Sequence, residues 1–304
     1  MLINPMRYFH MWNNRRIMDK YIDMDLNRRY NAQQVNTKSK TIIDLALSGY
    51  KSEQNSAGDD EKHQMDAVFR MYARSQMKVF IFAGHDTTST TICYSWLLLS
   101  RNPKALATLR AEHNEVLGPD KDKAASSLSS DPTLLNQLPY TLAVIKETLR
   151  IFPVVSSPRG GVRDFFLTDS KGRKFPTEHC LVWAVHHGLH NNPLWWPRVK
   201  EFLPERFLND ESRLEELRPL KNAWRPFELG PRACIGTELA MTELKIVLAL
   251  TARDFELKES FDEFHHLYKP GGVKHVNGER AYQVQLGSAH PVDGLPVRLA
   301  LHEM

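Results

Sequence analysis

The chain has 304 residues, of which 42% are hydrophobic and 25% are charged, a balance that is ordinary for a folded globular protein. Its formal net charge of +4 comes from 40 basic and 36 acidic side chains without clustered basic stripes, which argues against a nucleic-acid-binding protein. The three cysteines, Cys93, Cys180 and Cys234, are far apart and odd in number, so they favour a reducing compartment and predict neither a disulfide framework nor a zinc site.

The first 63 residues are expected to form a charged amphipathic helical region followed by a polar linker. Apolar residues such as Tyr8, Ile22 and Leu26 recur through residues 6–50, whereas residues 51–63 are almost entirely polar. No apolar run here approaches the ~20 residues that a membrane-spanning helix needs. This segment therefore predicts neither a signal peptide nor a membrane anchor.

Helices are predicted for most of residues 64–152. The first covers 64–100 and is expected to be interrupted near its middle, because Gly84 and the hydroxyls of Thr87 and Thr88 weaken a helix locally. A second helix covers residues 104–117 and ends at a Gly-Pro pair.

A Ser- and Asp-rich loop is predicted for residues 121–131, before a further helix that begins at Pro139 and ends before Pro153. Short β-like runs then follow, separated by Gly and Pro turns, which predicts a small mixed sheet. Near the carboxyl end, alternating patterns predict a hairpin formed by residues 282–287 and 295–302.

The most specific signal lies at residues 227–236. Cys234 comes directly before a pattern of helical spacing, so it is expected at or just before a helix N-terminus. The partial positive charge of that end, together with Arg232, favours the thiolate, which is the form that binds metal. Gly230 and Gly236 are expected to let the backbone turn sharply and approach a flat ligand closely. A lone cysteine would by itself be more simply interpreted as a buried free thiol.

The pattern resembles the haem-binding loop of the cytochromes P450, and Phe227, Gly230, Arg232, Cys234 and Gly236 match its fixed positions. The order of the remaining features is that of the carboxy-terminal portion of a P450. The sequences of residues 181–193 and 224–257 look most like those of fungal P450s of secondary metabolism.

The resemblance implies a mainly α fold with small β-sheets, a P450-like fold from which the amino-terminal part is missing. It implies one partial haem domain over residues 1–304. Its expected segments are a helical lead-in and polar loop (1–63), the oxygen-groove helix through the Glu/Arg helix (64–152), a small sheet and irregular segment (153–230), and the haem-loop helix with a terminal hairpin (231–304).

Glu147 and Arg150 lie three residues apart on one face of a predicted helix, so their side chains can pair. Such spacings are mostly solvated surface pairs. In the family that the chain resembles, however, a second arginine joins the pair in a buried network, and Arg206 matches that position. The resemblance therefore implies a structural network of these three residues that anchors the segment carrying the haem loop.

The segment Ala83–Thr88 resembles the oxygen-binding groove of P450s, in which an acid and the following threonine deliver protons for O–O cleavage. Asp86 and Thr87 match those two catalytic positions. A crossing of helices through small residues is the alternative interpretation of this segment. His85 is expected to point away from the site.

Arginines are suited to neutralise the haem propionates, because each guanidinium presents a fork of donors. The resemblance assigns this role to Arg232 and Arg159, with Arg163 as a competing choice, and Trp224 is expected to pack rather than to contact ligand.

Three histidines, His186, His187 and His190, have a spacing that could suggest a metal site. No carboxylate accompanies them in the sequence, so surface and helix-capping roles are favoured.

The resemblance implies an oxidoreductase, a haem-thiolate monooxygenase that inserts one oxygen atom of O2 into an apolar small molecule such as a secondary-metabolite intermediate. Haem b would be bound through Cys234 as axial ligand, and electrons would come from NADPH through a separate flavoprotein reductase, because the chain has no dinucleotide-binding fingerprint. The family works at the cytoplasmic side of the endoplasmic reticulum, and a chain without an anchor would be cytosolic.

Two alternatives remain open. One is a non-catalytic or truncated haem-binding fragment. The other is a haem-thiolate isomerase or dehydratase that needs no reductant, against which the pairing of Asp86 with Thr87 argues.

Overall fold

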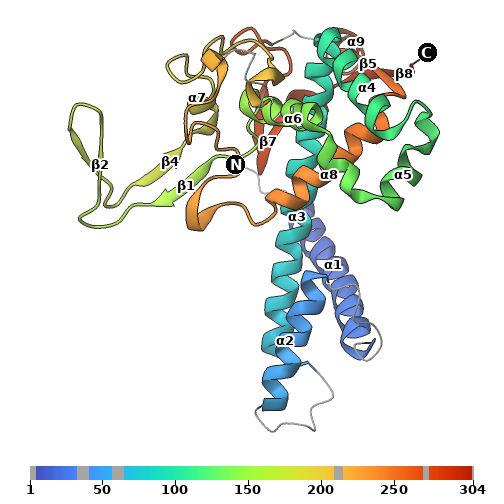
Figure 1. Ribbon diagram of the computed structural model, residues 1–304. Helices are drawn as coiled ribbons and strands as arrows, with labels where there is room; N and C mark the ends of the chain where they lie inside the picture. Colours follow the sequence, from blue (N-terminus) through green and yellow to red (C-terminus); the bar gives the residue numbers. More distant parts are fainter. Residues whose placement is uncertain (1–4, 33–40, 57–64, 209–214, 270–273, 303–304) are drawn as a thin grey trace. The chain divides into compact units, whose positions relative to one another are not determined.

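The computed structural model describes residues 5–32, 41–56, 65–208, 215–269 and 274–302, and helices predominate among them (Figure 1). The chain forms two compact units, residues 1–83 and 84–304. The expected division of the chain at residues 63, 152 and 230 stays a prediction.

The α-helices in chain order are α1 (Pro5–Ala32), α2 (Ile42–Ser56), α3 (Ala67–Arg101), α4 (Pro103–Leu117), α5 (Ala124–Ser130), α6 (Pro139–Ile151), α7 (His186–His190), α8 (Thr237–Thr251) and α9 (Phe261–Tyr268). Short 3-10 turns are η1 (Lys121–Lys123), η2 (Pro132–Gln137), η3 (Pro204–Phe207), η4 (Glu215–Leu217), η5 (Gly230–Arg232) and η6 (Val292–Gly294). The strands are β1 (Ser157–Gly160), β2 (Phe166–Thr168), β3 (Lys174–Pro176), β4 (Leu181–Ala184), β5 (Phe255–Glu259), β6 (Gln283–Leu286), β7 (Ser288–Pro291) and β8 (Val297–Leu301).

In the first unit, α1, α2 and the beginning of α3 share a small core. Leu26 of α1 and Leu47 of α2 are fully buried in it, and the ring of Tyr50 stacks on that of Phe69 with centroids 4.0 Å apart. The Tyr50 hydroxyl also donates a hydrogen bond of 2.6 Å to Asp66, so apolar packing and a polar contact both hold α2 against the beginning of α3.

The expected amphipathic stripe along residues 6–50 is wrong in its extent. Ile22 and Leu26 are buried, but Tyr8 and Tyr21 are 60% and 66% exposed. The apolar residues of α1 are spread around the helix rather than gathered on one face, so only a short stretch can pack. The expected polar linker is also partly wrong, because α2 continues to Ser56. Residues 57–63 lie outside the described residues.

The helix α3 runs without a break through Ala83–Thr88, so the expected interruption there is wrong. The physical reason is local: the hydroxyls of Ser89 and Thr91 donate to the carbonyls of Asp86 and Thr87 at 3.1 and 2.8 Å. These bonds run back within the helix and are compatible with it. The hydroxyl of Thr88, which was expected to compete with the helix, donates instead to Glu243 at 3.5 Å.

In the second unit, α3, α4, α6 and α8 pack around the largest apolar cluster, and α6 lies against α8 in Figure 1. The fully buried side chains of Leu109 from α4, Ile145 from α6 and Leu248 from α8 meet there. A second cluster joins α3 to the carboxyl end of the chain, with the rings of Tyr94 and Phe152 stacked at 4.0 Å. These clusters hold α3 and α8, which carry the expected site residues.

The expected loop at residues 121–131 is instead the turn η1 followed by α5. Ala124 and Leu128 are buried against Leu117, Leu135 and Ala249. Burial of two apolar side chains outweighs the weak helix preference of the four serines.

The strands of the described segments form four two-stranded antiparallel sheets: β1 with β4, β2 with β3, β5 with β8, and β6 with β7. The expected mixed sheet is therefore wrong in its strand directions. The expected terminal hairpin is wrong in its pairing, since residues 283–286 pair with 288–291 and residues 297–301 return to β5. A tight turn at Gly287 joins β6 directly to β7, in place of the longer connection between residues 287 and 295 that was expected.

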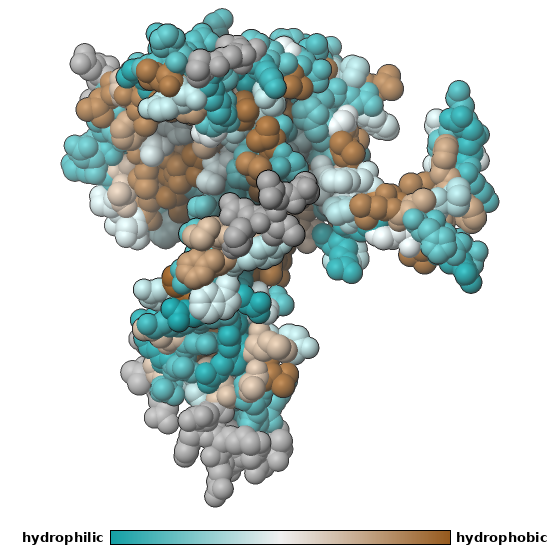
Figure 2. Space-filling model, turned by 180° about the vertical axis from the view of Figure 1, so that it is seen from behind, coloured by the Kyte–Doolittle hydropathy of each residue, from teal (hydrophilic) through white to brown (hydrophobic). Residues whose placement is uncertain are grey.

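No helix within the described ranges is long and apolar enough to cross a membrane. Large apolar side chains are nevertheless exposed in both units, as the brown areas of Figure 2 show.

Candidate functional site

Cys234 lies two residues before Gly236, the N-terminal cap of α8, in the loop that follows η5. Its backbone N–H donates to the carbonyl of Phe227 at 2.8 Å, and its own carbonyl accepts from the hydroxyl of Thr237 at 2.8 Å. The thiol is free and exposed. The loop therefore presents a thiol at the positive end of a 15-residue helix, with the backbone held on both sides.

The two glycines of the loop differ in what they do. Gly230 has a φ of +75°, a left-handed conformation in which a side chain would be strained. Gly236 has a φ of −85°, and a Cβ there would meet the Cys234 Sγ at an ordinary 3.8 Å. The left-handed conformation that favours glycine is found at Gly230. Gly236 also lies in a turn, but in a backbone conformation that any residue can adopt.

Glu228 ties this loop to its surroundings, although the sequence argument did not single it out. Its own φ is +59°, and its carboxylate accepts from the Arg225 guanidinium at 2.7 Å. On its other oxygen it faces Nε2 of the buried His186 at 3.0 Å. Burial raises the pKa of Glu228, but hydrogen bonds from Arg225, Ser157 and His186 outweigh it and hold the pKa at about 2. The Glu228 carboxylate is therefore ionised at neutral pH.

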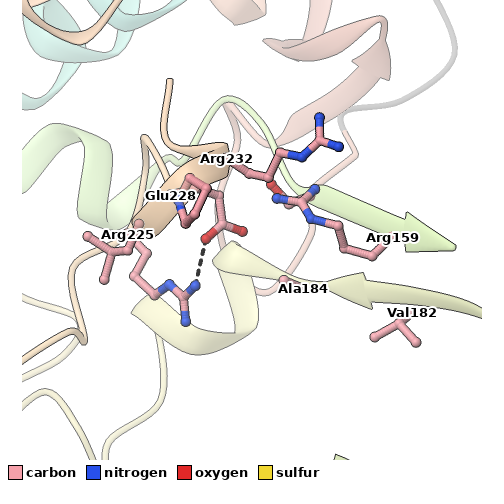
Figure 3. Close-up of a pocket in the computed structure, with 9 residues that line it drawn as sticks. Arg159, Val182, Ala184, Arg225, Glu228 and Arg232 are labelled. Atoms are coloured by element: carbon pink, nitrogen blue, oxygen red, sulfur yellow. Dashed lines mark hydrogen bonds and ion pairs between the residues drawn. The ribbon is translucent and has the colours of Figure 1, made fainter. Parts of the chain in front are cut away.

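A pocket of about 280 Å³ opens beside the loop (Figure 3). It is lined by Ser157, Arg159, Val182, Ala184, Arg225, Glu228, Leu229, Pro231 and Arg232. Strand β1 supplies Arg159 and turn η5 supplies Arg232, so the structure brings together the two arginines that the resemblance proposed for the propionates. Arg163 is not among the lining residues and pairs instead with Glu178 at 3.0 Å.

The residues present fit a haem. Arg225 is neutralised by Glu228, whereas Arg159 and Arg232 form no ion pair with any carboxylate of the described residues, which leaves two cations for an anionic ligand group. The apolar side chains of Ile235 and Leu239, which are neighbours of Cys234 in the sequence, are 84% and 61% exposed. Exposed apolar side chains of this kind suit contact with an apolar ligand. With a volume of about 280 Å³, the pocket can hold the propionate edge of a haem but not the whole haem.

Glu147, Arg150 and Arg206 form one fully buried ionic network. Arg150 donates to both carboxylate oxygens of Glu147 at 2.8 Å, and Arg206 Nε donates to the same carboxylate at 3.2 Å. Arg150 also donates to the carbonyls of His190 and Glu201, both at 3.1 Å. The network therefore joins α6 to α7 and to the irregular segment before η3.

Trp224 packs, as expected: its Nε1–H donates to the carbonyl of Lys146 at 3.0 Å and its ring lies against the main core. The expected surface role of the histidines at the end of β4 is wrong for two of them. His186 and His190 are buried, with rings 5.9 Å apart, and burial with the adjacent His186 lowers the pKa of His190 to about 3. Within the ranges that the structure describes, no group of three or more His, Cys, Asp or Glu residues could hold a metal ion.

Asp86 and Thr87 lie side by side in α3, both partly buried. Asp86 Oδ1 lies 3.2 Å from Nε2 of His290 on β7, a second residue that the sequence argument missed because it expected a turn there. The next residue, Thr88, donates to Glu243 of α8 across 3.5 Å. No backbone partner crowds Gly84, whose Cβ position has nothing within 4 Å, so a small-residue helix crossing at this point is not what the described residues show.

The chain was compared with known proteins. The family model of cytochrome P450 matches residues 1–286. Over 307 residues the chain is 46% identical to the cytochrome P450 monooxygenase polC of Polytolypa hystricis, covering 98% of this chain and 54% of polC. It is 35% identical over 314 residues to the cytochrome P450 monooxygenase acrF of Aspergillus aculeatus, covering 97% of this chain and 62% of acrF. The chain thus spans between half and two thirds of the length of these relatives.

Solved structures agree in fold. The crystal structure of the cytochrome P450 CYP102L1 superimposes with a TM-score of 0.71 at 24% identity, over 98% of this chain and 58% of that one. The haem-thiolate family is the class that this fold and the cysteine loop define. The chain belongs to the cytochrome P450 family.

Proposed function

We propose that this chain acts as the haem-thiolate part of a monooxygenase, with Cys234 as the axial ligand of haem b. One observation carries the proposal: the exposed Cys234 thiol stands before α8 on the same loop as the arginine-lined pocket. Membership of the P450 family supports it.

Each residue of the site has a proposed task. Cys234 would hold the iron, and Arg159 and Arg232 would hold the propionates in the pocket that both of them line. Phe227 would keep the loop in place through its carbonyl, which accepts from the Cys234 N–H. Gly230 would provide the left-handed turn. When bound, haem supplies the activation of O2 and the transfer of one oxygen atom to a C–H bond or an olefin.

The network of Glu147, Arg150 and Arg206 would be structural. It lies under the segment that leads into the haem loop, and each of its members is fully buried. Losing one member would leave uncompensated buried charge. Its proposed task is to keep the segment between α7 and η3 folded, so that the haem loop at residues 227–236 keeps its position.

Asp86 and Thr87 would move protons. Thr87 would position a proton or a water at the reacting oxygen, and Asp86 would connect Thr87 to solvent. Burial raises the pKa of Asp86, but polar groups of Ser288 and the charge of His290 leave it below its ordinary value. Asp86 would therefore be an ionised carboxylate at neutral pH, ready to accept a proton.

The proposed substrate is an apolar small molecule, such as an intermediate of secondary metabolism. Electrons would come from NADPH through a separate flavoprotein reductase, and the working place would be the cytoplasmic side of the endoplasmic reticulum. The isomerase or dehydratase alternative would need no reductant, so dependence on NADPH separates the two.

The test of the proposal is the carbon monoxide spectrum. The protein is loaded with haem, reduced and exposed to carbon monoxide, and the red-shifted Soret band of thiolate ligation is expected. Cys234→Ala should abolish this band. Cys180→Ala is the matched control, because Cys180 is also free and exposed but lies outside the site. Absence of the band in the unchanged protein, or its survival in Cys234→Ala, would overturn the proposal.

The proton relay has its own test. Thr87→Ala should raise the share of electrons lost as hydrogen peroxide, because the proton would no longer be positioned. The ratio of peroxide to NADPH consumed is measured in the presence of a reductase. An unchanged ratio would remove Thr87 from this role.

A further inference from the structure

His290 on β7 contacts two residues of α3 that lie one helical turn apart. Its Nε2 is 3.2 Å from Asp86 Oδ1 and 3.3 Å from the hydroxyl of Ser288, and its Nδ1 is 3.2 Å from the hydroxyl of Thr90. Both ring nitrogens are therefore engaged. The imidazole therefore joins the central part of α3 to the hairpin of β6 and β7.

The hairpin that carries His290 is held in place independently of this contact. The N–H of Ala289 donates to the carbonyl of Val154 at 2.8 Å, and the side chain of Gln283 donates to that of Pro153 at 3.1 Å. The hydroxyl of Tyr94 on α3 reaches the carbonyl of Ala281 at 3.0 Å. The ring is thus presented to Asp86 by a fixed support rather than by a free loop.

The contacts of His290 suit both charge states of the ring. In the cation, Nε2–H faces the Asp86 carboxylate and Nδ1–H donates to the hydroxyl oxygen of Thr90. In the neutral ring, the Thr90 hydroxyl can rotate and donate to a bare Nδ1, or accept from a protonated one. A proton that passes from Nε2 to Asp86 therefore breaks neither contact, because the new O–H of Asp86 then donates to the bare Nε2.

The two side chains differ in their exposure to solvent. His290 is 25% exposed and Asp86 is 16% exposed, and Asp86 Oδ2 is buried without a partner of ordinary hydrogen-bond geometry in the described residues. Of the two groups, the ring is thus the more accessible to a proton from water.

We propose that His290 is a positioning residue for Asp86, which holds the carboxylate in place and keeps a proton that it exchanges with Asp86 Oδ1. In the exchange the Nε2–H bond of the imidazolium breaks and an O–H bond forms on Asp86, so the opposite charges of the two groups disappear together. The neutral ring keeps its proton on Nδ1, toward Thr90, until water returns a proton to Nε2. This inference rests on the proposed function of Asp86 as the link between Thr87 and solvent.

The pH dependence of this pair involves few other groups. The described polar contacts of the ring come from α3, through Asp86 and Thr90, and from its own strand, through Ser288. On the paired strand β6, its register partner is Val284, which carries no charge. Among these contacts, Asp86 is the charged group that the ring faces.

The experiment is an NMR titration of the Asp86 carboxyl carbon in the unchanged chain and in His290→Gln, whose amide keeps a donor but carries no charge. The midpoint of Asp86 should rise in His290→Gln, because the charge of His290 helps to hold the pKa of Asp86 below its ordinary value. An unchanged midpoint would overturn the proposal. His302→Gln is the matched control, since it removes a histidine that faces Glu256 instead and should leave the midpoint of Asp86 where it is.

If His290→Gln does not fold, His290→Asn takes its place. Its side chain is also uncharged, so the midpoint of Asp86 should again rise, and an unchanged midpoint would overturn the proposal.

The carbon monoxide spectrum of the haem-loaded chain separates this inference from the proposed function. A normal band together with an Asp86 midpoint that does not change in His290→Gln means that only the inference on His290 has failed. A missing band means that the proposed function has failed, and the titration still decides whether His290 acts on Asp86.

Discussion

His186 and Glu228 form a contact of 3.0 Å between Nε2 and Oε1, with side chains only 2% and 9% exposed. The second ring nitrogen of His186 faces the carbonyl of Val155 at 2.8 Å. Through His186 the loop that carries Cys234 is connected to α7 and to the segment between α6 and β1. Glu228 adopts its left-handed backbone because these partners hold it there.

Replacement of Glu228 by Gln should change how stability depends on pH. The pKa of Glu228 in the fold is about 2, below its ordinary 4.5, so its contribution is complete above about pH 4.5 and is lost as the pH falls toward 2. Near neutral pH, Glu228→Gln should lower the free energy of unfolding by about 2 kcal/mol or more, and below pH 4.5 this difference should shrink. Urea unfolding at several pH values measures both.

The control for Glu228 is Glu263→Gln, which removes a carboxylate whose partner Arg298 lies at the surface. Its curve should stay close to that of the unchanged protein. A constant difference between Glu228→Gln and the unchanged protein across the whole pH range would contradict the assignment.

Loss of Glu147 should be among the most damaging single changes in the chain. Glu147→Ala leaves Arg150 and Arg206 buried without their carboxylate, so the free energy of unfolding should fall by about 3–5 kcal/mol. Chemical unfolding followed by near-ultraviolet circular dichroism gives this value. Glu178→Ala, which breaks an exposed pair with Arg163, should cost less than about 1 kcal/mol. Similar losses in both variants would show that burial of the network does not matter.

The two glycines of the haem loop should respond differently to alanine. Gly230→Ala places a side chain at a φ of +75° and should destabilise the fold by about 1–2 kcal/mol, although nothing lies within 4 Å of the new Cβ. Gly236→Ala, at a φ of −85°, should leave the free energy of unfolding unchanged or slightly improved. Thermal and urea unfolding of the chain without haem measure this. Equal losses would mean that space rather than backbone conformation decides at Gly230.

The arginines of the pocket can be ranked by haem release. Arg159→Gln and Arg232→Gln should each speed the transfer of haem to an acceptor protein by about tenfold or more, because each removes charge-assisted hydrogen bonds worth about 1.5–3 kcal/mol. Arg163→Gln should leave the rate unchanged, because Arg163 does not line the pocket and pairs with Glu178. A faster release from Arg163→Gln, with no effect from Arg159→Gln, would reverse the assignment of the second propionate partner.

Local patterns predicted the positions of the main helices and of the cysteine loop, because caps, prolines and apolar spacing act over a few residues. The same reasoning failed at α5, where a Ser-rich segment becomes helical through Leu128, which is buried against distant residues. It failed again at the carboxyl end, where the partner of residues 297–301 is β5, some 40 residues earlier. Pairing between distant strands depends on what the intervening chain packs against, and no local pattern carries that information.

The sequence by itself determined the family, the candidate ligand Cys234 and the residues Glu147, Arg150 and Arg206, because a motif of fixed spacing constrains the residue types wherever the chain folds. Only the tertiary structure decided which groups surround them. It placed Glu228 on His186 and Asp86 on His290, contacts between residues 42 and 204 positions apart. Such contacts come from the packing of separate elements into shared cores, so they become visible only once the chain has folded.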